Sequence, residues 1–280
     1  MKVKVAKEAG FCFGVKRAMK MAWNELELSS DIYALGPLIH NKQAVQKYED
    51  RGLITVDTIN DIPSNKSVII RSHGVSKDIY EKANSNNLNI IDTTCPFVRK
   101  IHNIVKEFYE NGFKIIIIGD KNHPEIIGIN GWCENSALII KSIDDINSLN
   151  LDNNSKYCVV AQTTLNLELY NNIVNILSKK LDNITVKNTI CSATKTRQQA
   201  AKELSINVDC MIVIGGKHSS NTQKLVNICK EKGPTFSIET KEDLYIDIDK
   251  LNKFNTIGVT AGASTPDWII EDVISFIESL

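Results

Sequence analysis

Three cysteines stand where an apolar-rich segment gives way to a helical pattern: Cys12, Cys95 and Cys191. Pro96, directly after Cys95, suits the first position of a helix, where a missing N–H costs nothing. The free N–H groups at a helix N-terminus lower the pKa of a nearby thiol and favour the thiolate, which is the form that binds metals. A cation follows each cysteine four residues later, so the three positions share one local chemistry.

Three thiolates that meet at one point would form a metal centre. Structural zinc sites take four protein ligands, usually at short paired spacings, and catalytic zinc usually includes histidine. No C-x-x-C pair occurs in this sequence. Three isolated cysteines fit a cubane [4Fe-4S] cluster better, because they would hold three irons and leave the fourth open to a substrate oxygen. The alternative is that all three are buried structural thiols, since free cysteine is among the most buried residue types.

Four further cysteines do not share this pattern. Cys158 and Cys210 lie in or at the start of apolar runs that predict strands, and Cys229 lies in a helical one. We expect these three to pack in the core. Cys133 has no assignment from the sequence.

The three junction cysteines head three copies of one longer pattern. A glycine recurs 24 residues after each of them, at Gly36, Gly119 and Gly215, and each glycine ends an apolar strand. An acidic-apolar pair, a second strand with a polar loop and another helix follow in the same order in each copy. Strands that alternate with helices predict parallel sheets built from βαβ units.

We therefore predict an α/β fold of three similar αβα lobes in a pseudo-threefold trefoil around a central iron–sulfur cluster. The third copy ends before its last strand, and residues 2–7 supply a spare one, so the N-terminal strand should complete the third lobe. The predicted lobes are residues 12–94, residues 95–190, and residues 191–280 with 1–11. Ligands of open α/β sheets bind beyond the carboxyl ends of the strands, where the cysteines and the polar loops should converge.

The predicted loops hold many neutral hydrogen-bond donors and few cations. Histidines, serines and asparagines at predicted helix starts favour an anion site, notably for phosphate or diphosphate. Ordinary N-capping is an equally common role for serine and asparagine there, and it is compatible with anion binding. Glu125 is the one carboxylate we place at the centre, as a candidate proton donor beside His123. The alternative is a first-turn glutamate that the helix dipole favours.

Bulk composition excludes several classes. Lys+Arg and Asp+Glu number 33 each, which argues against a nucleic-acid-binding protein because phosphate neutralisation needs a basic surplus. No run of apolar residues is long enough for a membrane span, and the N-terminus lacks the apolar core of a signal peptide. Seven cysteines without a plausible disulfide framework suit a reducing compartment. We expect a cytoplasmic protein.

Several motifs together resemble one family, the hydroxymethylbutenyl diphosphate reductases (LytB/IspH), over the whole chain. They are Gly-Phe-Cys-Phe-Gly-Val at 10–15, Asp-Thr-Thr-Cys-Pro at 92–96, His-Pro-Glu at 123–125, Gln-Thr-Thr at 162–164, Cys-Ser-Ala-Thr at 191–194, Ser-Ser-Asn at 219–221 and Ala-Gly-Ala-Ser-Thr-Pro-Asp at 261–267. The resemblance implies the last step of the methylerythritol phosphate route to isoprenoids. There, 4-hydroxy-3-methylbut-2-enyl diphosphate takes up two electrons and two protons, loses water, and yields isopentenyl and dimethylallyl diphosphate.

The resemblance also implies roles for single residues. The cluster ligands would be Cys12, Cys95 and Cys191, with the substrate hydroxyl at the open iron. Glu125 would be the proton donor, Thr163 would support the substrate hydroxyl and the proton path, and a ferredoxin or flavodoxin would supply electrons. The diphosphate would be held by a set of neutral donors with His123 close by: His40, His73, Ser219, Ser220, Asn221 and Ser264.

Two other readings remain open from the sequence. Another three-lobed, three-cysteine [4Fe-4S] enzyme, such as quinolinate synthase or a diphthamide-synthesis protein, would need a pocket for a dicarboxylate or for S-adenosylmethionine. The histidine set disfavours both. An iron–sulfur sensor or carrier would need neither Glu125 nor the histidines.

Overall fold

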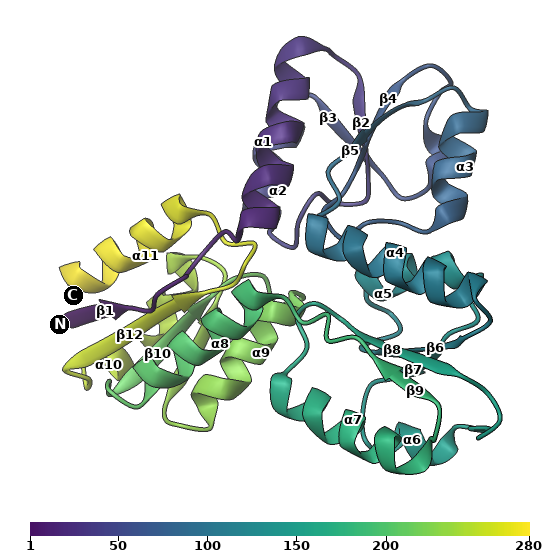
Figure 1. The fold of residues 1–280 in the computed structure, drawn as a ribbon. Coiled ribbons are helices and arrows are strands. Elements are labelled where there is room, and N and C mark those ends of the chain that lie inside the picture. The colour runs from purple at the N-terminus through teal and green to yellow at the C-terminus, as the bar shows by residue number, and fades with distance from the viewer. The chain divides into compact units, whose positions relative to one another are not determined.

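The structure is a computed structural model that describes residues 1–280 (Figure 1). The chain divides into two compact units. Unit 1 consists of residues 1–16, 39–48 and 192–280, and unit 2 consists of residues 17–38 and 49–191. Each unit is described separately below. No helix combines the length and the apolar character that crossing a bilayer requires.

Three four-stranded parallel sheets form the framework, as the repeat predicts. Unit 2 contains sheet I, of order β3-β2-β4-β5, and sheet II, of order β7-β6-β8-β9, while unit 1 contains sheet III, of order β1-β12-β10-β11. The strands are β2 (Ile32–Leu35), β3 (Leu53–Val56), β4 (Ser67–Ile70), β5 (Asn89–Asp92), β6 (Lys114–Ile118), β7 (Leu138–Ile140), β8 (Tyr157–Ala161), β9 (Ile184–Val186), β1 (Lys2–Val5), β10 (Cys210–Ile214), β11 (Thr235–Ile238) and β12 (Thr256–Ala261).

The N-terminal strand completes sheet III, which confirms the prediction. β1 pairs with β12 in parallel, with Lys2 opposite Thr256 and Val5 opposite Val259. The last and the first strands of the chain are therefore neighbours, as Figure 1 shows in yellow and purple. The boundaries of the three lobes stay a prediction.

Helices separate the strands along the chain. The long ones are α1 (Phe13–Leu28), α2 (Lys42–Glu49), α3 (Lys77–Ser85), α4 (Pro96–Glu110), α7 (Leu167–Lys180), α8 (Ser192–Ser205), α9 (Ser220–Lys230) and α11 (Asp267–Ser279). The short ones are α5 (Pro124–Asn130), α6 (Asp145–Ser148), α10 (Ile248–Leu251) and three 3₁₀ segments, η1 (Ile59–Asp61), η2 (Gly131–Cys133) and η3 (Lys241–Asp247).

The central strands are largely buried on both faces and rich in apolar residues, as is usual in parallel sheets. In β6, Ile115 and Ile117 belong to the cluster formed with α4 and α5, whereas Ile116 and Ile118 belong to the one formed with α7. In β10, Met211 and Val213 pack with α9, whereas Cys210, Ile212 and Ile214 pack with α11. Side chains alternate across a strand, and each strand therefore joins two helical layers.

The threefold repeat is visible in equivalent hydrogen bonds. The amides of Gly36, Gly119 and Gly215 donate to the carbonyls of Val56, Ile140 and Ile238, each at 2.8 Å. The acidic residue of each repeated acidic-apolar pair accepts backbone N–H groups of the turn before it, from Thr58 to Asp61, from Ser142 to Asp145 and from Glu239 to Asp243. The recurring residues thus close the same turns in all three sheets.

Candidate active site

Each of the three junction cysteines directly precedes a helix. Cys12 comes before α1, Cys95 is the N-cap of α4, and Cys191 comes before α8. Cys12, Cys95 and Cys191 form no disulfide and are half-buried, whereas the other four cysteines are buried. Their placement beside free helix N–H groups is the environment that favours a thiolate. Cys12 lies in unit 1, and Cys95 and Cys191 lie in unit 2.

One backbone hydrogen bond ties each of these cysteines to a polar loop. The amides of Cys12, Cys95 and Cys191 donate to the carbonyls of Ala263 (3.3 Å), Ser72 (3.0 Å) and Thr163 (3.0 Å). These loops follow β12, β4 and β8, and they carry Ser264, His73 and Thr163, which are three of the residues predicted to act on substrate. The position of each thiol is therefore fixed relative to a residue that would contact the ligand.

Glu125 is a buried carboxylate held by Thr163 in unit 2. Its side chain is 2% exposed. The Thr163 amide donates to Oε1 at 2.6 Å, and the Thr163 hydroxyl is 2.6 Å from Oε2. Such short bonds to both oxygens fix the orientation of the carboxyl group. Glu125 thus contacts Thr163, whose carbonyl in turn accepts from the amide of Cys191.

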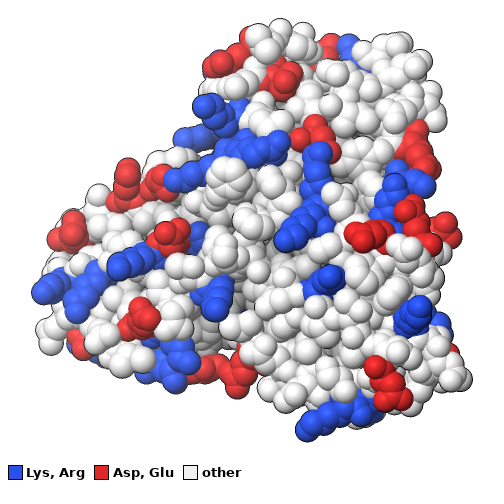
Figure 2. Space-filling model, viewed as in Figure 1, with Lys and Arg blue, Asp and Glu red and all other residues white.

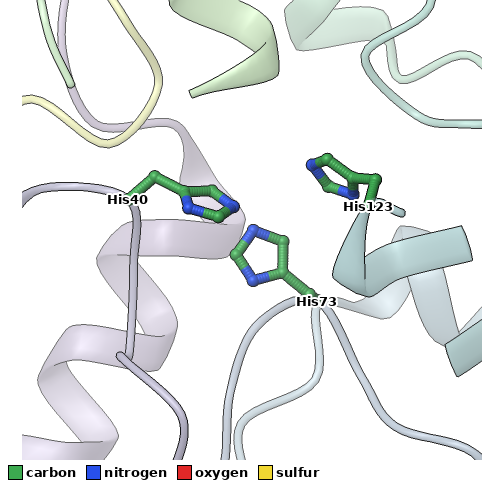
Figure 3. Close-up of side chains that lie close together, drawn as sticks. All are labelled: His40, His73 and His123. Atoms are coloured by element: carbon green, nitrogen blue, oxygen red, sulfur yellow. The ribbon is translucent and has the colours of Figure 1, made fainter. Parts of the chain in front are cut away.

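His123 caps the helix that carries Glu125. Its Nδ1 accepts from the Glu125 amide at 3.1 Å, which leaves Nε2 to carry the proton in the neutral imidazole. The rings of His73 and His123 lie edge to face, with centroids 5.6 Å apart, and Figure 3 shows both side chains. Figure 3 also labels His40, which belongs to unit 1 and is described there. His123 therefore presents an N–H donor beside a second histidine.

Unit 1 contains two helix N-termini with capping side chains. Ser219 is the N-cap of α9 and accepts from the Thr222 amide, and Asn41 accepts from the Ala44 amide in the first turn of α2. Asn221 is 4% exposed, and neither atom of its carboxamide has a hydrogen-bond partner. The Nδ2 of Asn41 is also buried without one. Buried amide groups without partners are costly, so these side chains suit a ligand that supplies the missing bonds.

The loops that carry His40 and Ser264 belong to the same unit. A Cβ at Gly216 would lie 2.5 Å from the His40 carbonyl oxygen, so the approach of the two loops requires glycine. Ser264 lies in the turn between β12 and α11, and Ser220 begins α9; both are half-buried. Unit 1 therefore collects Ser219, Ser220, Asn221, Ser264 and His40, while Thr163, His73, His123 and Glu125 belong to unit 2.

Arg197 is a buried residue that the sequence analysis did not single out. It lies on α8 and is 1% exposed. Its Nε donates to the Glu8 carbonyl at 2.7 Å and its Nη2 to the Gly10 carbonyl at 2.8 Å. This guanidinium thereby holds the segment that leads into Cys12. Only the folded arrangement reveals this role, because an arginine six residues after a cysteine carries no such signal by itself.

Asp92 has a comparable role at Cys95. It accepts from the Thr94 amide at 2.9 Å, from the Tyr80 hydroxyl at 2.9 Å and from Arg99 at 2.6 Å. Asp92 opens the motif at 92–96 and Arg99 is the cation four residues after Cys95, but the sequence alone did not pair them. Together they close the turn that presents the thiol.

His102 supports the loop that follows His73. Its ring stacks on Trp132 with centroids 5.2 Å apart, and a Cβ at Gly74 would collide with it. Burial lowers the pKa of His102 to about 4, so the ring is neutral at physiological pH. His102 therefore has a buried packing role.

The four remaining cysteines pack in the core, as expected for three of them. Cys158 lies in β8, Cys210 in β10 and Cys229 in α9, and all are at most 2% exposed. Burial raises the pKa of each of these three thiols to about 12. Cys133 is buried in η2, where its Sγ lies 3.2 Å from the Asn130 carbonyl oxygen, and burial raises its pKa to about 11. All four are neutral thiols.

Charged side chains of both signs are interspersed on the face shown in Figure 2. This distribution agrees with the zero net charge of the sequence.

Comparison with known proteins identifies close relatives. A family model described as LytB protein matches residues 3–278. A 4-hydroxy-3-methylbut-2-enyl diphosphate reductase of Clostridioides difficile (strain 630) is 62% identical over the full length of both chains. A protein of the same name from Alkaliphilus oremlandii (strain OhILAs) is 51% identical, also over both full lengths.

Solved structures agree with the fold. The E-1-hydroxy-2-methyl-but-2-enyl-4-diphosphate reductase of Plasmodium falciparum superposes with a TM-score of 0.93 at 34% identity, and the match covers 100% of this chain and 87% of that one. A structure described as (E)-4-hydroxy-3-methyl-but-2-enyl diphosphate reductase, the terminal enzyme of the non-mevalonate pathway, gives a TM-score of 0.73 at 39% identity over all of both chains.

Thiol reactivity should separate the two classes of cysteine. When native protein without bound iron is treated with iodoacetamide at pH 8, Cys12, Cys95 and Cys191 should be alkylated at least about tenfold faster than Cys158 or Cys210, because only exposed thiolates react. Peptide mass spectrometry measures each rate. Protein denatured in urea is the control and should react at all seven cysteines. Equal rates in the native protein would contradict the assignment.

Arg197→Met should destabilise the fold by about 2–4 kcal/mol, because it leaves the buried Gly10 carbonyl and the partly buried Glu8 carbonyl without this donor. Urea unfolding of the protein measures the change. Lys202→Met, on the exposed face of the same helix, is the matched control and should change the free energy of unfolding by less than about 0.5 kcal/mol. A loss for Arg197→Met no larger than that of the control would show that these hydrogen bonds do not hold the Cys12 segment.

Proposed function

Because the chain belongs to the LytB family, we propose that it is an iron–sulfur reductase that converts 4-hydroxy-3-methylbut-2-enyl diphosphate to isopentenyl and dimethylallyl diphosphate. In the balanced reaction the substrate takes up two electrons and two protons, its C–O bond breaks, and the hydroxyl oxygen leaves as water. The observation that carries the proposal is the chain of contacts from Cys191 through Thr163 to Glu125, which ties a metal-ligand candidate to a buried proton-donor candidate.

The junction cysteines fit a [4Fe-4S] cluster. They are three half-buried cysteines at helix N-termini, while the other four cysteines are buried in apolar surroundings that disfavour the thiolate. Cys12, Cys95 and Cys191 would hold the cluster. When bound, it supplies single electrons and one iron that is a Lewis acid without a protein ligand.

Glu125 would deliver a proton to the reacting end of the substrate. Protonated Glu125 can donate along the 2.6 Å contact to the Thr163 hydroxyl, which can in turn donate to the substrate oxygen. Thr163 thus orients the carboxyl group and relays its proton. General acid catalysis of this kind contributes roughly 10²–10⁴-fold to a rate.

The diphosphate would be held by neutral donors and helix N-termini. In unit 1, Ser219, Ser220, Asn221 and Ser264 surround the starts of α9 and α11, and His40 precedes α2. The partial positive charge at a helix N-terminus and its free N–H groups favour phosphate oxygens. In unit 2, the Nε2–H of His123 and the side chain of His73 would add donors. Neutral donors bind a diphosphate without the strong ion pairs that would slow product release.

Electrons must come from outside the chain, which contains no nucleotide-binding motif. We propose a ferredoxin or flavodoxin as the donor, since each carries single electrons at low potential.

Glu125→Gln should lower kcat at least about 10²-fold while leaving the iron content unchanged, because the amide cannot supply the proton and Glu125 is not a cluster ligand. Anaerobic turnover with reduced methyl viologen, together with iron analysis, measures both. Glu168→Gln, an exposed first-turn glutamate on α7, is the control and should keep full activity. Full turnover by Glu125→Gln would refute the proton-donor role.

Asn221→Asp should raise KM for the diphosphate substrate about 10- to 100-fold, because it replaces a buried donor with a negative charge of the same shape. Steady-state kinetics measure the change, with kcat much less affected. Asn227→Asp, an exposed position on the same helix, is the control and should leave KM unchanged. An unaltered KM in Asn221→Asp would place the diphosphate elsewhere.

A further inference from the structure

Unit 2 contains a cavity of about 290 Å³ at the carboxyl ends of β2, β3 and β4. Its wall includes Leu35 at the end of β2, Asp57 after β3 and Arg71 after β4. None of the junction cysteines, the histidines or Glu125 lines it. The proposed reaction therefore leaves this space without a function.

Three charged residues line this cavity, namely Asp57, Arg71 and Lys82, and Lys82 pairs with Asp78. The guanidinium of Arg71 lies over Gly36, where an added Cβ would be 2.6 Å from Nη1 and where φ is +70°, so a side chain is excluded on both counts. The Nε of Arg71 is buried and has no hydrogen-bond partner, and no carboxylate lies within ion-pair distance of the guanidinium. Asp57 lines the same cavity without pairing to it.

A desolvated cation without a partner is expensive for a folded protein. Burial lowers the pKa of Arg71, and no neighbouring acid offsets this effect. The guanidinium nevertheless stays protonated at physiological pH, because the ordinary pKa of an arginine lies far above that pH. An oxyanion that supplies two parallel acceptors would remove most of the penalty.

The location is one where α/β sheets bind ligands. In sheet I the chain runs from β2 outward to β3 and then crosses to β4 and outward to β5. The strand order therefore reverses between β2 and β4, and the crevice beyond the carboxyl ends of such a pair is the usual binding position. Gly36 and Arg71 directly follow these two strands.

The rest of the wall is mixed. Ile59, Ile79 and Ile127 give it an apolar side, and Ile127 is 53% exposed although it is a large apolar residue. Thr58 and Ser76 add hydroxyl groups. A wall of this kind suits a short hydrocarbon body with one anionic end.

We propose that this cavity binds a small organic anion, whose phosphate or carboxylate group pairs with the guanidinium of Arg71 and whose short hydrocarbon part packs on Ile59, Ile79 and Ile127. Gly74 and Pro124 also line the cavity. Gly74 directly follows His73 and Pro124 directly precedes Glu125, so an occupant would contact the two segments that carry these residues.

The indole N–H of Trp132 reports on occupancy. It donates to the carbonyl of Val75 at 3.1 Å, and Val75 lines the cavity. The holoprotein labelled with ¹⁵N-tryptophan would be titrated with 3-methylbutyl phosphate, 4-methylpentanoate, inorganic phosphate and the neutral alcohol 3-methylbutanol. We expect the Trp132 indole signal to shift and saturate with at least one of the two organic anions and not with the alcohol. A response to only the phosphate ester or only the carboxylate identifies which anion the site takes.

Two variants decide whether the response comes from this cavity. Arg71→Gln should weaken binding at least tenfold, and Ile127→Glu should do so as well by placing a carboxylate at an exposed part of the wall. Asn221→Asp, which alters the proposed diphosphate site, should leave the titration unchanged. The proposal is overturned if no anion gives a saturable shift at millimolar concentration. It is also overturned if Ile127→Glu, and Arg71→Gln where that variant folds, bind the anion with unchanged affinity. The readout does not depend on turnover, so it is independent of the reductase assignment.

Discussion

The amide of each junction cysteine donates to the carbonyl of the loop beyond the neighbouring strand, and the chemistry of the molecule depends on this repeated bond. A parallel sheet brings the carboxyl ends of its strands to one edge, so a strand that leads into a cysteine and the strand beside it end together. The bond then fixes the thiol and the first residues of the polar loop as one piece. The proposed metal ligands and the proposed substrate-binding residues therefore cannot shift independently within a sheet.

The two compact units contribute different chemistry. Unit 1 offers helix N-termini, buried amides and hydroxyl groups, which suit an anion, while unit 2 offers the buried carboxyl group of Glu125 and two of the cysteines. Neutral donors and a single acid are a suitable combination for a substrate that keeps its diphosphate while its hydroxyl leaves. A lysine-rich site would hold the diphosphate more tightly, and it would hold the product equally well.

Local sequence signals predicted the framework because that framework repeats. Cysteine before a helix, glycine after a strand and the acid of each acidic-apolar pair occur three times, and each makes the same kind of hydrogen bond with the backbone in every copy. Arg197, His102 and Arg71 could not be predicted in the same way. Their partners or their lack of partners depend on segments tens to hundreds of residues away, such as the Gly10 carbonyl, the Trp132 ring and Gly36. Residue type alone does not show whether a buried polar group is satisfied.

Three of the buried polar side chains without hydrogen-bond partners lie at positions where a ligand is expected. Asn221 and Asn41 lie at helix starts in unit 1, and Arg71 lies at the strand-order reversal of sheet I. Each such group costs about 1–3 kcal/mol, or more when it is charged, and the surrounding core must offset that cost. Both faces of the central strands are packed with isoleucine and valine, and this packing gives each sheet the stability to do so. The apolar packing of the strands therefore offsets the cost of the polar groups near their ends that lack partners. A bound ligand would supply the missing hydrogen bonds to these groups.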